Sequence, residues 1–419
     1  MYAVAGSILD VSSTGDLNLL KDQVILVNGS GHIEYLSSKS TLPSKFSQVP
    51  VTNYDDAWIL PPFVDSHIHF PQLDIIGCHS GTLLSWLETL TFPTEAKFNA
   101  VDYAKPAADA FCEELCRNGV GAAMVFSSSD YGATEVLFES FAASGMRAIA
   151  GRSSMNRMAP ESILVDVAED AQSTQSLINS WHGFDDRLYV ALTPRFAPSV
   201  TEPLLASCSK FLETYPDLYV QTHISETQDE IDLVKQLFPD AKDYLSVYED
   251  YGLLGDRTVL AHGIYLTASE RHRVIKTGSL ISHCPTSNFF LGSGLFPYLE
   301  HSSLGGGVLL GSDIGAGTSF SPWRTMGEAY KVSKLLGGAV APGKLLYDST
   351  LGAASLLKLA SGAGITVGAP ADFQVLEPFA QPLMARRKAQ QLDQIVGGLM
   401  YLADDRNLKQ IYVQGRPLI

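Results

Sequence analysis

The protein has 419 residues, of which 46% are hydrophobic and 18% charged, and its formal net charge is -16. A chain of this length and composition can bury a large core, and we expect one large domain with a smaller one. The acidity and the lack of basic runs exclude nucleic acid as a partner. No apolar run is long enough to span a membrane and no signal peptide is evident, so we expect a cytoplasmic protein with no membrane partner.

Short strands are predicted near both ends of the chain. Residues 23–27 and 32–36 flank an Asn-Gly-Ser-Gly turn, a pattern typical of a β-hairpin. Residues 371–376 have a similar composition near the other end. We expect the segments 1–59 and 366–419 to pair as one discontinuous β-sandwich domain.

The middle of the chain, residues 60–365, carries eight apolar runs. Most are near-continuous and lack strict alternation, as expected for parallel strands buried on both faces, and helical patterns separate most of them. Eight βα repeats predict a TIM barrel, and the Gly-x-Gly-x-x-Gly marker of the alternative, a doubly wound sheet, is missing. The runs lie near residues 60–69, 120–127, 146–152, 187–193, 218–223, 258–264, 279–283 and 307–313.

Four side chains of the kind that bind metals end three of these runs. His67 and His69 end the first run, His223 ends the fifth and Asp313 ends the eighth. Residues i and i+2 of a strand point the same way, and the carboxyl ends of barrel strands meet at one mouth. An isolated His-x-His is common and proves little, but this correlated placement predicts a zinc-type site. The segment at the fourth run, Tyr189–Arg195, offers no lysine that could be carboxylated to bridge two metals, which favours a single metal.

Other polar residues follow the neighbouring runs. Glu226 lies three residues after His223, where a carboxylate can move a proton between water and substrate; its alternative role is a charge at a helix N-terminus. His262 ends the sixth run and is placed to orient the water. His283 ends the seventh run and is a weaker candidate for substrate contact. Arg195 is placed to donate to a substrate carbonyl, the alternative being a surface ion pair.

These residues stand in segments that resemble the amidohydrolase superfamily and, within it, the guanine deaminase family. Residues 62–72, Pro-Phe-Val-Asp-Ser-His-Ile-His-Phe-Pro-Gln, resemble the first-strand motif, and residues 84–98 resemble the loop that covers the pocket. Asn156 and Ala316 depart from the family pattern, which concerns fine specificity and leaves the reaction type unchanged. Further matching segments are Thr193–Pro198, Gln221–Glu226, Ala261–Gly263, His283–Asn288, Gly311–Phe320 and Asp404–Asn407.

The resemblance implies zinc-dependent hydrolytic deamination of guanine to xanthine and ammonia, with one zinc per subunit and iron as the alternative metal. It leaves a homodimer open. The metal ligands it implies are His67, His69, His223 and Asp313. The residues that handle protons and charge are Glu226, His262 and Asp313. The purine contacts are Gln72, Leu83, Trp86, Arg195 and Phe196.

Three alternative functions remain to be weighed. One is a deaminase of a related heterocycle such as 8-oxoguanine, a pterin or a triazine, and another is a non-catalytic relative that keeps the barrel for assembly. The second is disfavoured because all four metal-type residues are present. The third, a P-loop suggested by residues 338–344, fails because Leu345 replaces the serine or threonine that would hold magnesium.

Overall fold

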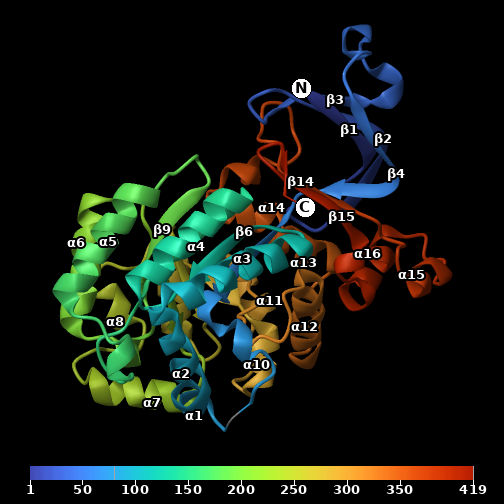
Figure 1. Ribbon diagram of the computed structural model, residues 1–419. Helices are drawn as coiled ribbons and strands as arrows, with labels where there is room; N and C mark the ends of the chain where they lie inside the picture. Colours follow the sequence, from blue (N-terminus) through green and yellow to red (C-terminus); the bar gives the residue numbers. More distant parts are fainter. Residues whose placement is uncertain (80, 419) are drawn as a thin grey trace.

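A parallel barrel forms the larger part of the computed structural model, which describes residues 1–79 and 81–418 (Figure 1). Its eight strands pair in the order β13-β12-β11-β10-β9-β7-β6-β5, and the short β8 (Ser153–Ser154) pairs with β9. The strands lie in the eight apolar runs, which confirms the predicted TIM barrel. Their bounds are β5 Phe63–His69, β6 Val120–Phe126, β7 Arg147–Gly151, β9 Leu188–Pro194, β10 Tyr219–Ile224, β11 Thr258–His262, β12 Leu280–His283 and β13 Val308–Leu310.

The barrel closes between β5 and the residues after β13. The backbone N–H of Asp313 donates to the carbonyl of His67 at 2.8 Å, and that of His69 donates to the carbonyl of Ile314 at 3.0 Å. Asp65 adds a side-chain link, because its Oδ1 accepts from the N–H of Ser312 at 3.0 Å. The first and eighth strand ends are therefore tied together.

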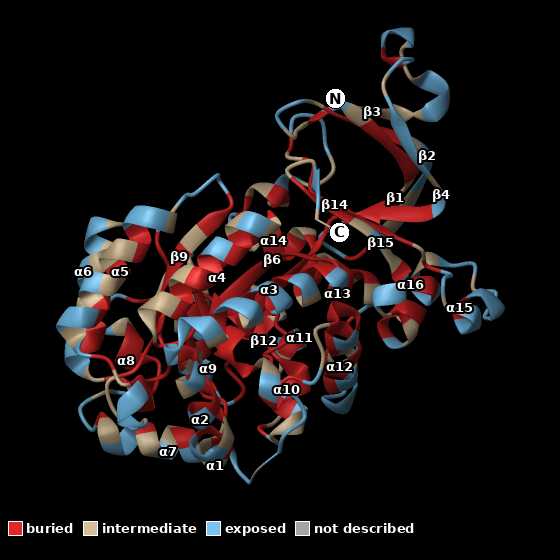
Figure 2. Ribbon diagram, in the orientation of Figure 1, coloured by how far each residue is buried: buried red, intermediate tan, exposed pale blue. Residues whose placement is uncertain are grey.

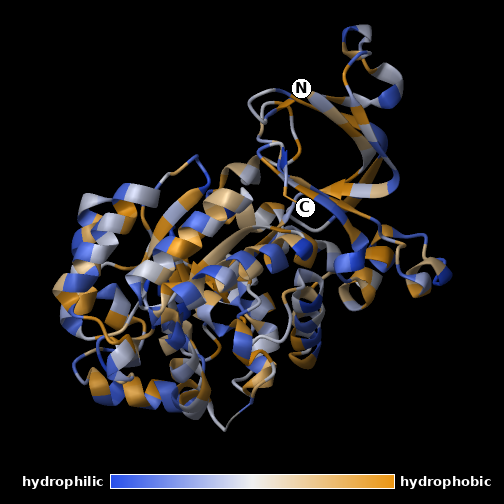
Figure 3. Ribbon diagram, in the orientation of Figure 1, coloured by the Kyte–Doolittle hydropathy of each residue, from blue (hydrophilic) through white to orange (hydrophobic). Residues whose placement is uncertain are grey.

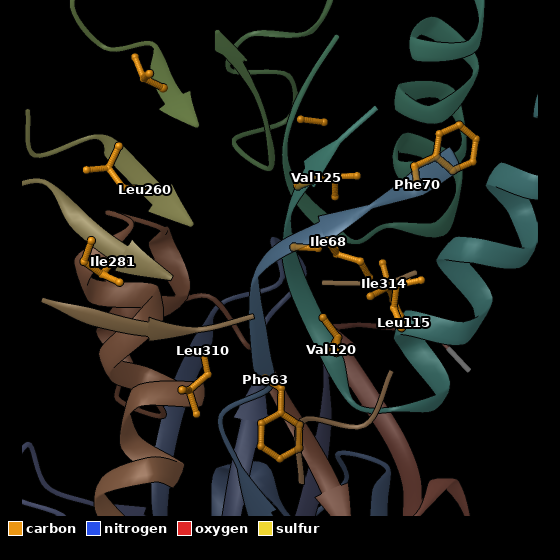
Figure 4. Close-up of a cluster of buried hydrophobic side chains, with 14 of the residues drawn as sticks. Phe63, Ile68, Phe70, Leu115, Val120, Val125, Leu260, Ile281, Leu310 and Ile314 are labelled. Carbon is orange, nitrogen blue, oxygen red and sulfur yellow. The ribbon is translucent and has the colours of Figure 1, made fainter. Parts of the chain in front are cut away.

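Alternate residues of each strand pack on opposite sides of the barrel wall. Val64 and Met124 belong to a cluster inside the barrel. Ile68 and Val125 belong to the larger cluster between the strands and the surrounding helices, part of which is drawn in Figure 4. Both faces are apolar, which explains the near-continuous apolar runs of the sequence.

Helices follow the strands and present buried faces to the barrel and exposed faces to solvent, as Figure 2 shows. Two of them begin with a capping box, at Thr227 and at Thr267. Their bounds are α1 Leu83–Trp86, α2 Phe92–Glu95, α3 Val101–Arg117, α4 Tyr131–Ser144, α5 Val167–Trp181, α6 Glu202–Thr214, α7 Gln228–Leu237, α8 Ser246–Glu249, α9 Ala268–Thr277, α10 Pro285–Phe290, α11 Tyr298–Ser303, α12 Pro322–Leu335, α13 Pro342–Ser349, α14 Leu351–Leu356, α15 Pro382–Arg386 and α16 Leu392–Leu402.

Strands from the two ends of the chain pair in one seven-stranded sheet, in the order β16-β15-β14-β4-β1-β2-β3. The predicted pairing of the ends is thus present, but the strands form one curved, continuous sheet rather than two separately hydrogen-bonded layers (Figure 1). Register shifts in β1, between Gly6 and Ile8, accompany this curvature. The bounds are β1 Tyr2–Val11, β2 Leu17–Val27, β3 Ile33–Ser38, β4 Val51–Leu60, β14 Phe373–Leu376, β15 Leu408–Val413 and β16 Arg416–Pro417.

Two helices interrupt the C-terminal segment that the sequence pattern assigned to strands. The chain forms α15 and α16 between β14 and β15. In α16 the residues Ile395, Val396, Leu399 and Met400 are buried. Their spacing is helical, and the apolar face packs against α12 and α13 of the barrel side.

A buried ion pair joins the barrel to the terminal sheet. Arg147 of β7 donates through Nε to Asp372 Oδ2 at 2.6 Å, and both side chains are almost fully buried. Arg147 also donates to the carbonyl of Asp186, and Asp372 accepts from the N–H of Gln414.

We expect Asp372→Asn to destabilise the protein by about 3 kcal/mol, because it leaves the buried Arg147 charge without its partner. Urea unfolding followed by circular dichroism measures the change. Glu328→Gln, which removes an ion pair with the exposed Lys331, is the control and should change the free energy of unfolding by less than about 0.5 kcal/mol. Equal effects of the two changes would contradict the expectation.

Apolar and polar residues are interleaved along the helices of the surface, as Figure 3 shows. Within residues 1–79 and 81–418, no helix has the length and apolar character needed to cross a membrane.

Candidate metal centre

Four side chains converge at the mouth of the barrel. Asp313 Oδ1 lies 3.2 Å from His67 Nε2 and 3.3 Å from His69 Nε2. His69 Nε2 lies 3.2 Å from His223 Nε2. One potential ligand atom from each of the four residues lies within 4.8 Å of all the others. The structure therefore brings together the four residues that the sequence predicted as metal ligands.

The arrangement of these four side chains fits a bound metal ion better than a network of hydrogen bonds. In a tetrahedral zinc site the ligand atoms lie about 3.3 Å apart, because each is about 2.0 Å from the ion. The observed separations of 3.2–3.3 Å match this value. His67 Nε2 is buried without a hydrogen-bond partner among the described residues. His223 Nδ1 must donate to the carbonyl of Arg195 at 2.7 Å, which leaves its Nε2 lone pair directed into the cluster.

Electrostatics keep the cluster in the form that binds metals. Burial lowers the pKa of His67, and it lowers that of His69 to about 4, so both imidazoles are neutral at pH 7. Burial opposes ionisation of Asp313, but the neighbouring histidines, His67 first, hold the pKa of its carboxyl well below the ordinary value. Neutral imidazoles and an ionised carboxylate are the ligand forms that zinc requires.

The end of β10 is held by a buried polar network behind the cluster. Tyr248 donates to the carbonyl of His223 at 2.9 Å and accepts from Thr222. Glu230 accepts from the backbone N–H of Glu226 at 2.8 Å and from the hydroxyl of Tyr244. These contacts fix His223 near the end of β10 and Glu226 in the turn that precedes α7.

Glu226 lies beside the cluster with its carboxyl group buried. Burial first, and then the charge of Asp313, raise the pKa of this carboxyl to about 8. Its Oε1 accepts from the hydroxyl of Ser293 at 2.8 Å, while its Oε2 lies 3.5 Å from His262 Nε2. A carboxyl group with a pKa near neutrality suits the exchange of protons.

His262 approaches the same region from the end of β11. Its Nδ1 donates to Asn288 Oδ1 at 2.9 Å, and its Nε2 lies 3.8 Å from Asp313 Oδ2. His262 has a φ of 71° and Asp313 a φ of 53°. Positive φ values are costly for residues other than glycine and are concentrated at functional sites, so both residues are held by their surroundings.

A small cavity opens onto the cluster. Five of its lining residues were predicted as purine contacts, and Ala316, one of the departures from the family pattern, also lies on its wall. The lining residues are His69, Gln72, Leu83, Trp86, Leu87, Arg195, Phe196, His223, Glu226, His262, Leu291, Asp313 and Ala316.

Two residues singled out from the sequence lie elsewhere. His283 ends β12 but is outside the described lining of the cavity, and its ring lies against Phe296 with the centroids 5.2 Å apart. Its contact with a substrate stays a prediction. Asn156, the other departure from the pattern, exchanges hydrogen bonds with Thr201 at the start of α6, so it supports the fold away from the cavity wall.

Comparisons with known proteins agree with this geometry. The model of the amidohydrolase family matches residues 58–418. The chain belongs to the amidohydrolase family. It is 38% identical to the guanine deaminase of Escherichia coli over 99% of this chain and 97% of that protein. The solved structure of E. coli guanine deaminase has a TM-score of 0.94 and 37% identity, covering 100% of this chain and 99% of the other.

A second solved structure is guanine deaminase from C. acetobutylicum with guanine bound in the active site. Its TM-score is 0.92 at 30% identity, and the match covers both chains completely. Similarity of this extent over the full length shows that the barrel and the terminal sheet both belong to the family architecture.

Several residues that support the site were missed by sequence reasoning. Glu95 and Asn288 stand within segments that were recognised, but nothing in the pattern distinguished them from their neighbours. Ser293 follows α10 in a loop and gave no signal, although it contacts Glu226 across 67 residues of sequence.

Proposed function

We propose that this protein is a guanine deaminase, which converts guanine and water to xanthine and ammonia. The observation that carries the proposal is that one cavity is lined both by three of the four clustered His/Asp residues and by the two base-reading candidates, Gln72 and Arg195. The similarity to guanine deaminases along the whole chain supports it.

We propose zinc as the metal and His67, His69, His223 and Asp313 as its ligands. A bound zinc ion lowers the pKa of a coordinated water towards about 7. With three neutral histidines and one carboxylate as ligands, water would enter as a fifth ligand, an expansion of coordination that zinc permits.

Glu226 is the proposed proton carrier. Its carboxyl group, held by Ser293 through Oε1, takes a proton from the attacking water and delivers it to N3, the ring nitrogen beside C2 of guanine. His262 orients the water and stabilises the charge that develops on its oxygen. The second proton of the water, still on the oxygen attached to C2, passes through Glu226 to the exocyclic amine; the C2–N bond then breaks, ammonia leaves and C2 keeps the carbonyl oxygen of xanthine.

The remaining lining residues position the purine. Gln72 and Arg195 hold its polar edge, and Leu83, Trp86 and Phe196 enclose the ring. Trp86 is fixed because its indole N–H donates to the carbonyl of Cys78 at 2.9 Å. Buried polar contacts of this kind discriminate strongly, because a wrong base leaves them unpaired.

A substrate panel tests the proposal. We expect the purified, zinc-loaded protein to release ammonia from guanine, with the absorbance change of xanthine formation. Turnover of 8-oxoguanine, a pterin or a triazine should be at least about 100-fold less efficient in kcat/KM. Metal analysis of the same sample should find about one zinc per chain, as a four-ligand site predicts. Preference for another heterocycle, or no ammonia from any of them, would refute the proposal.

A further inference from the structure

A buried carboxylate that belongs to neither the His/Asp cluster nor the cavity wall joins the two base-reading candidates. Glu95, at the end of α2, is 1% exposed. Its Oε1 accepts from Gln72 Nε2 at 2.9 Å, and its Oε2 accepts from Arg195 Nη1 at 2.6 Å. Gln72 follows β5 and Arg195 follows β9, so Glu95 links side chains from two different strand ends.

These contacts determine the positions of the oxygen and the nitrogen of the Gln72 side-chain amide. The backbone N–H of Gly315 can only donate, and it lies 3.0 Å from Gln72 Oε1. The other end of the amide faces the Glu95 carboxylate, which only accepts. Both constraints require the same orientation, with Oε1 occupied by Gly315 and with one N–H of Nε2 occupied by Glu95. With Oε1 turned toward Gly315, the amide keeps its second Nε2 N–H as a donor for the cavity.

Three contacts hold Arg195, two through its guanidinium group and one through its backbone carbonyl. Besides its ion pair with Glu95, its guanidinium carbon lies 5.4 Å from the centre of the Phe92 ring. Its backbone carbonyl accepts from His223 of the metal-type cluster. A guanidinium group carries donors and no acceptor.

The purine edge that meets Gln72 and Arg195 therefore faces donors only. Guanine presents two acceptors there, O6 and N7, whereas a 6-aminopurine presents N7 and a donating amine. Apart from these two residues, the polar residues of the cavity lining belong to the His/Asp cluster or are Glu226 and His262. In the proposed reaction those groups act on C2 and the atoms next to it. Gln72 and Arg195 therefore remain to contact O6 and N7.

We propose that Glu95 is a positioning residue that sets the specificity of the site for a 6-oxopurine, by holding the Gln72 amide and the Arg195 guanidinium as a donor-only edge. This inference rests on the proposed function. Glu95 acts through its two partners and lies outside the described cavity lining.

Glu95→Gln tests the proposal with guanine and 2,6-diaminopurine, which differ in the group at position 6 and in the hydrogen on the adjacent N1. A glutamine at position 95 can donate as well as accept, so one of the two constraints on the Gln72 amide is lost and only the N–H of Gly315 still opposes an orientation that offers an acceptor to the cavity. We expect the ratio of kcat/KM for guanine over kcat/KM for 2,6-diaminopurine to fall by about 10-fold or more. Glu95→Asp keeps the carboxylate and should retain most of the ratio.

Asp372→Asn is the matched control, since it also converts the acid of a buried arginine pair to its amide but lies at the opposite end of the barrel wall. It should lower stability and leave the ratio unchanged. Equal losses for both substrates in Glu95→Gln, with an unchanged ratio, would mean that Glu95 is merely structural and would overturn the proposal. If Glu95→Gln fails to fold, the same comparison is made with Glu95→Ala, which removes the carboxylate altogether, and an unchanged ratio in that variant overturns the proposal.

A binding measurement separates this inference from the proposed function. Hypoxanthine carries O6 and N7 but no amine at C2, so it binds without reacting. In calorimetric titrations we expect its Kd to rise by about 10-fold in Glu95→Gln and to stay unchanged in Asp372→Asn. An unchanged Kd in Glu95→Gln contradicts the role of Glu95. No guanine turnover by the unaltered protein, with hypoxanthine still bound more tightly than adenine, refutes the proposed function and leaves the role of Glu95 standing.

Discussion

Replacing Glu226 by glutamine should lower kcat for guanine by about 1000-fold, because the amide keeps the size of the side chain but cannot exchange a proton. The zinc content should stay at its original value, since Glu226 is not among the four clustered residues. KM should change little. Steady-state kinetics and metal analysis of the same preparation measure all three quantities.

Ser293→Ala provides the comparison for that variant. It removes the hydrogen bond to Glu226 Oε1 but leaves the carboxyl group in place. A hydrogen bond to a charged group is worth about 1.5 kcal/mol, so kcat should fall by about 10-fold only. If Glu226→Gln retained a tenth or more of the activity, Glu226 would not be the proton carrier.

Replacing His223 by alanine should remove both the metal and the activity. Loss of one of four ligands weakens zinc binding, and loss of the Lewis acid should lower kcat/KM by about 1000-fold or more. Chelation of the unaltered protein should have the same effect, and added zinc should restore only the unaltered protein. Metal content per chain, measured by mass spectrometry, is the decisive quantity.

His301→Gln controls for the loss of a buried histidine outside the site. Both ring nitrogens of His301 are buried without a hydrogen-bond partner among the described residues, as is His67 Nε2 of the cluster. His301 is nevertheless absent from the groups of described side chains that could hold a metal ion. This variant should keep its zinc. Full zinc occupancy in His223→Ala would exclude His223 as a ligand.

The barrel was predictable because its strands are buried on both faces. Residues such as Val64 and Ile68 contact different clusters, one inside the barrel and one outside, yet both must be apolar. The sequence therefore shows a run at each strand, and the rule that barrel strands end at one mouth locates His67, His69, His223 and Asp313 together.

The supporting residues were not predictable in the same way. Glu95 is separated in sequence from Gln72 by 23 residues and from Arg195 by 100 residues. A local sequence pattern does not predict contacts over such separations. The helix α16 was missed because the flanking strands β14 and β15 dominated the composition of the C-terminal segment. The helical conformation of α16 depends on its packing against α12 and α13, which only the folded structure provides.

The terminal sheet also has a consequence for synthesis of the chain. Strand β4 pairs with β14, and Gln374 Nε2 donates to the carbonyl of Pro61, 313 residues earlier. A ribosome that makes this protein from its N-terminus releases β1 to β4 first and must translate the whole barrel before β14 emerges. During that interval one edge of β4 has unpaired backbone hydrogen-bonding groups, and residues that are buried in the folded protein, such as Trp58 and Ile59, are exposed. This edge can pair with the same strand of another nascent chain. On a polysome, the β4 edge is therefore the site at which we expect premature association between neighbouring copies.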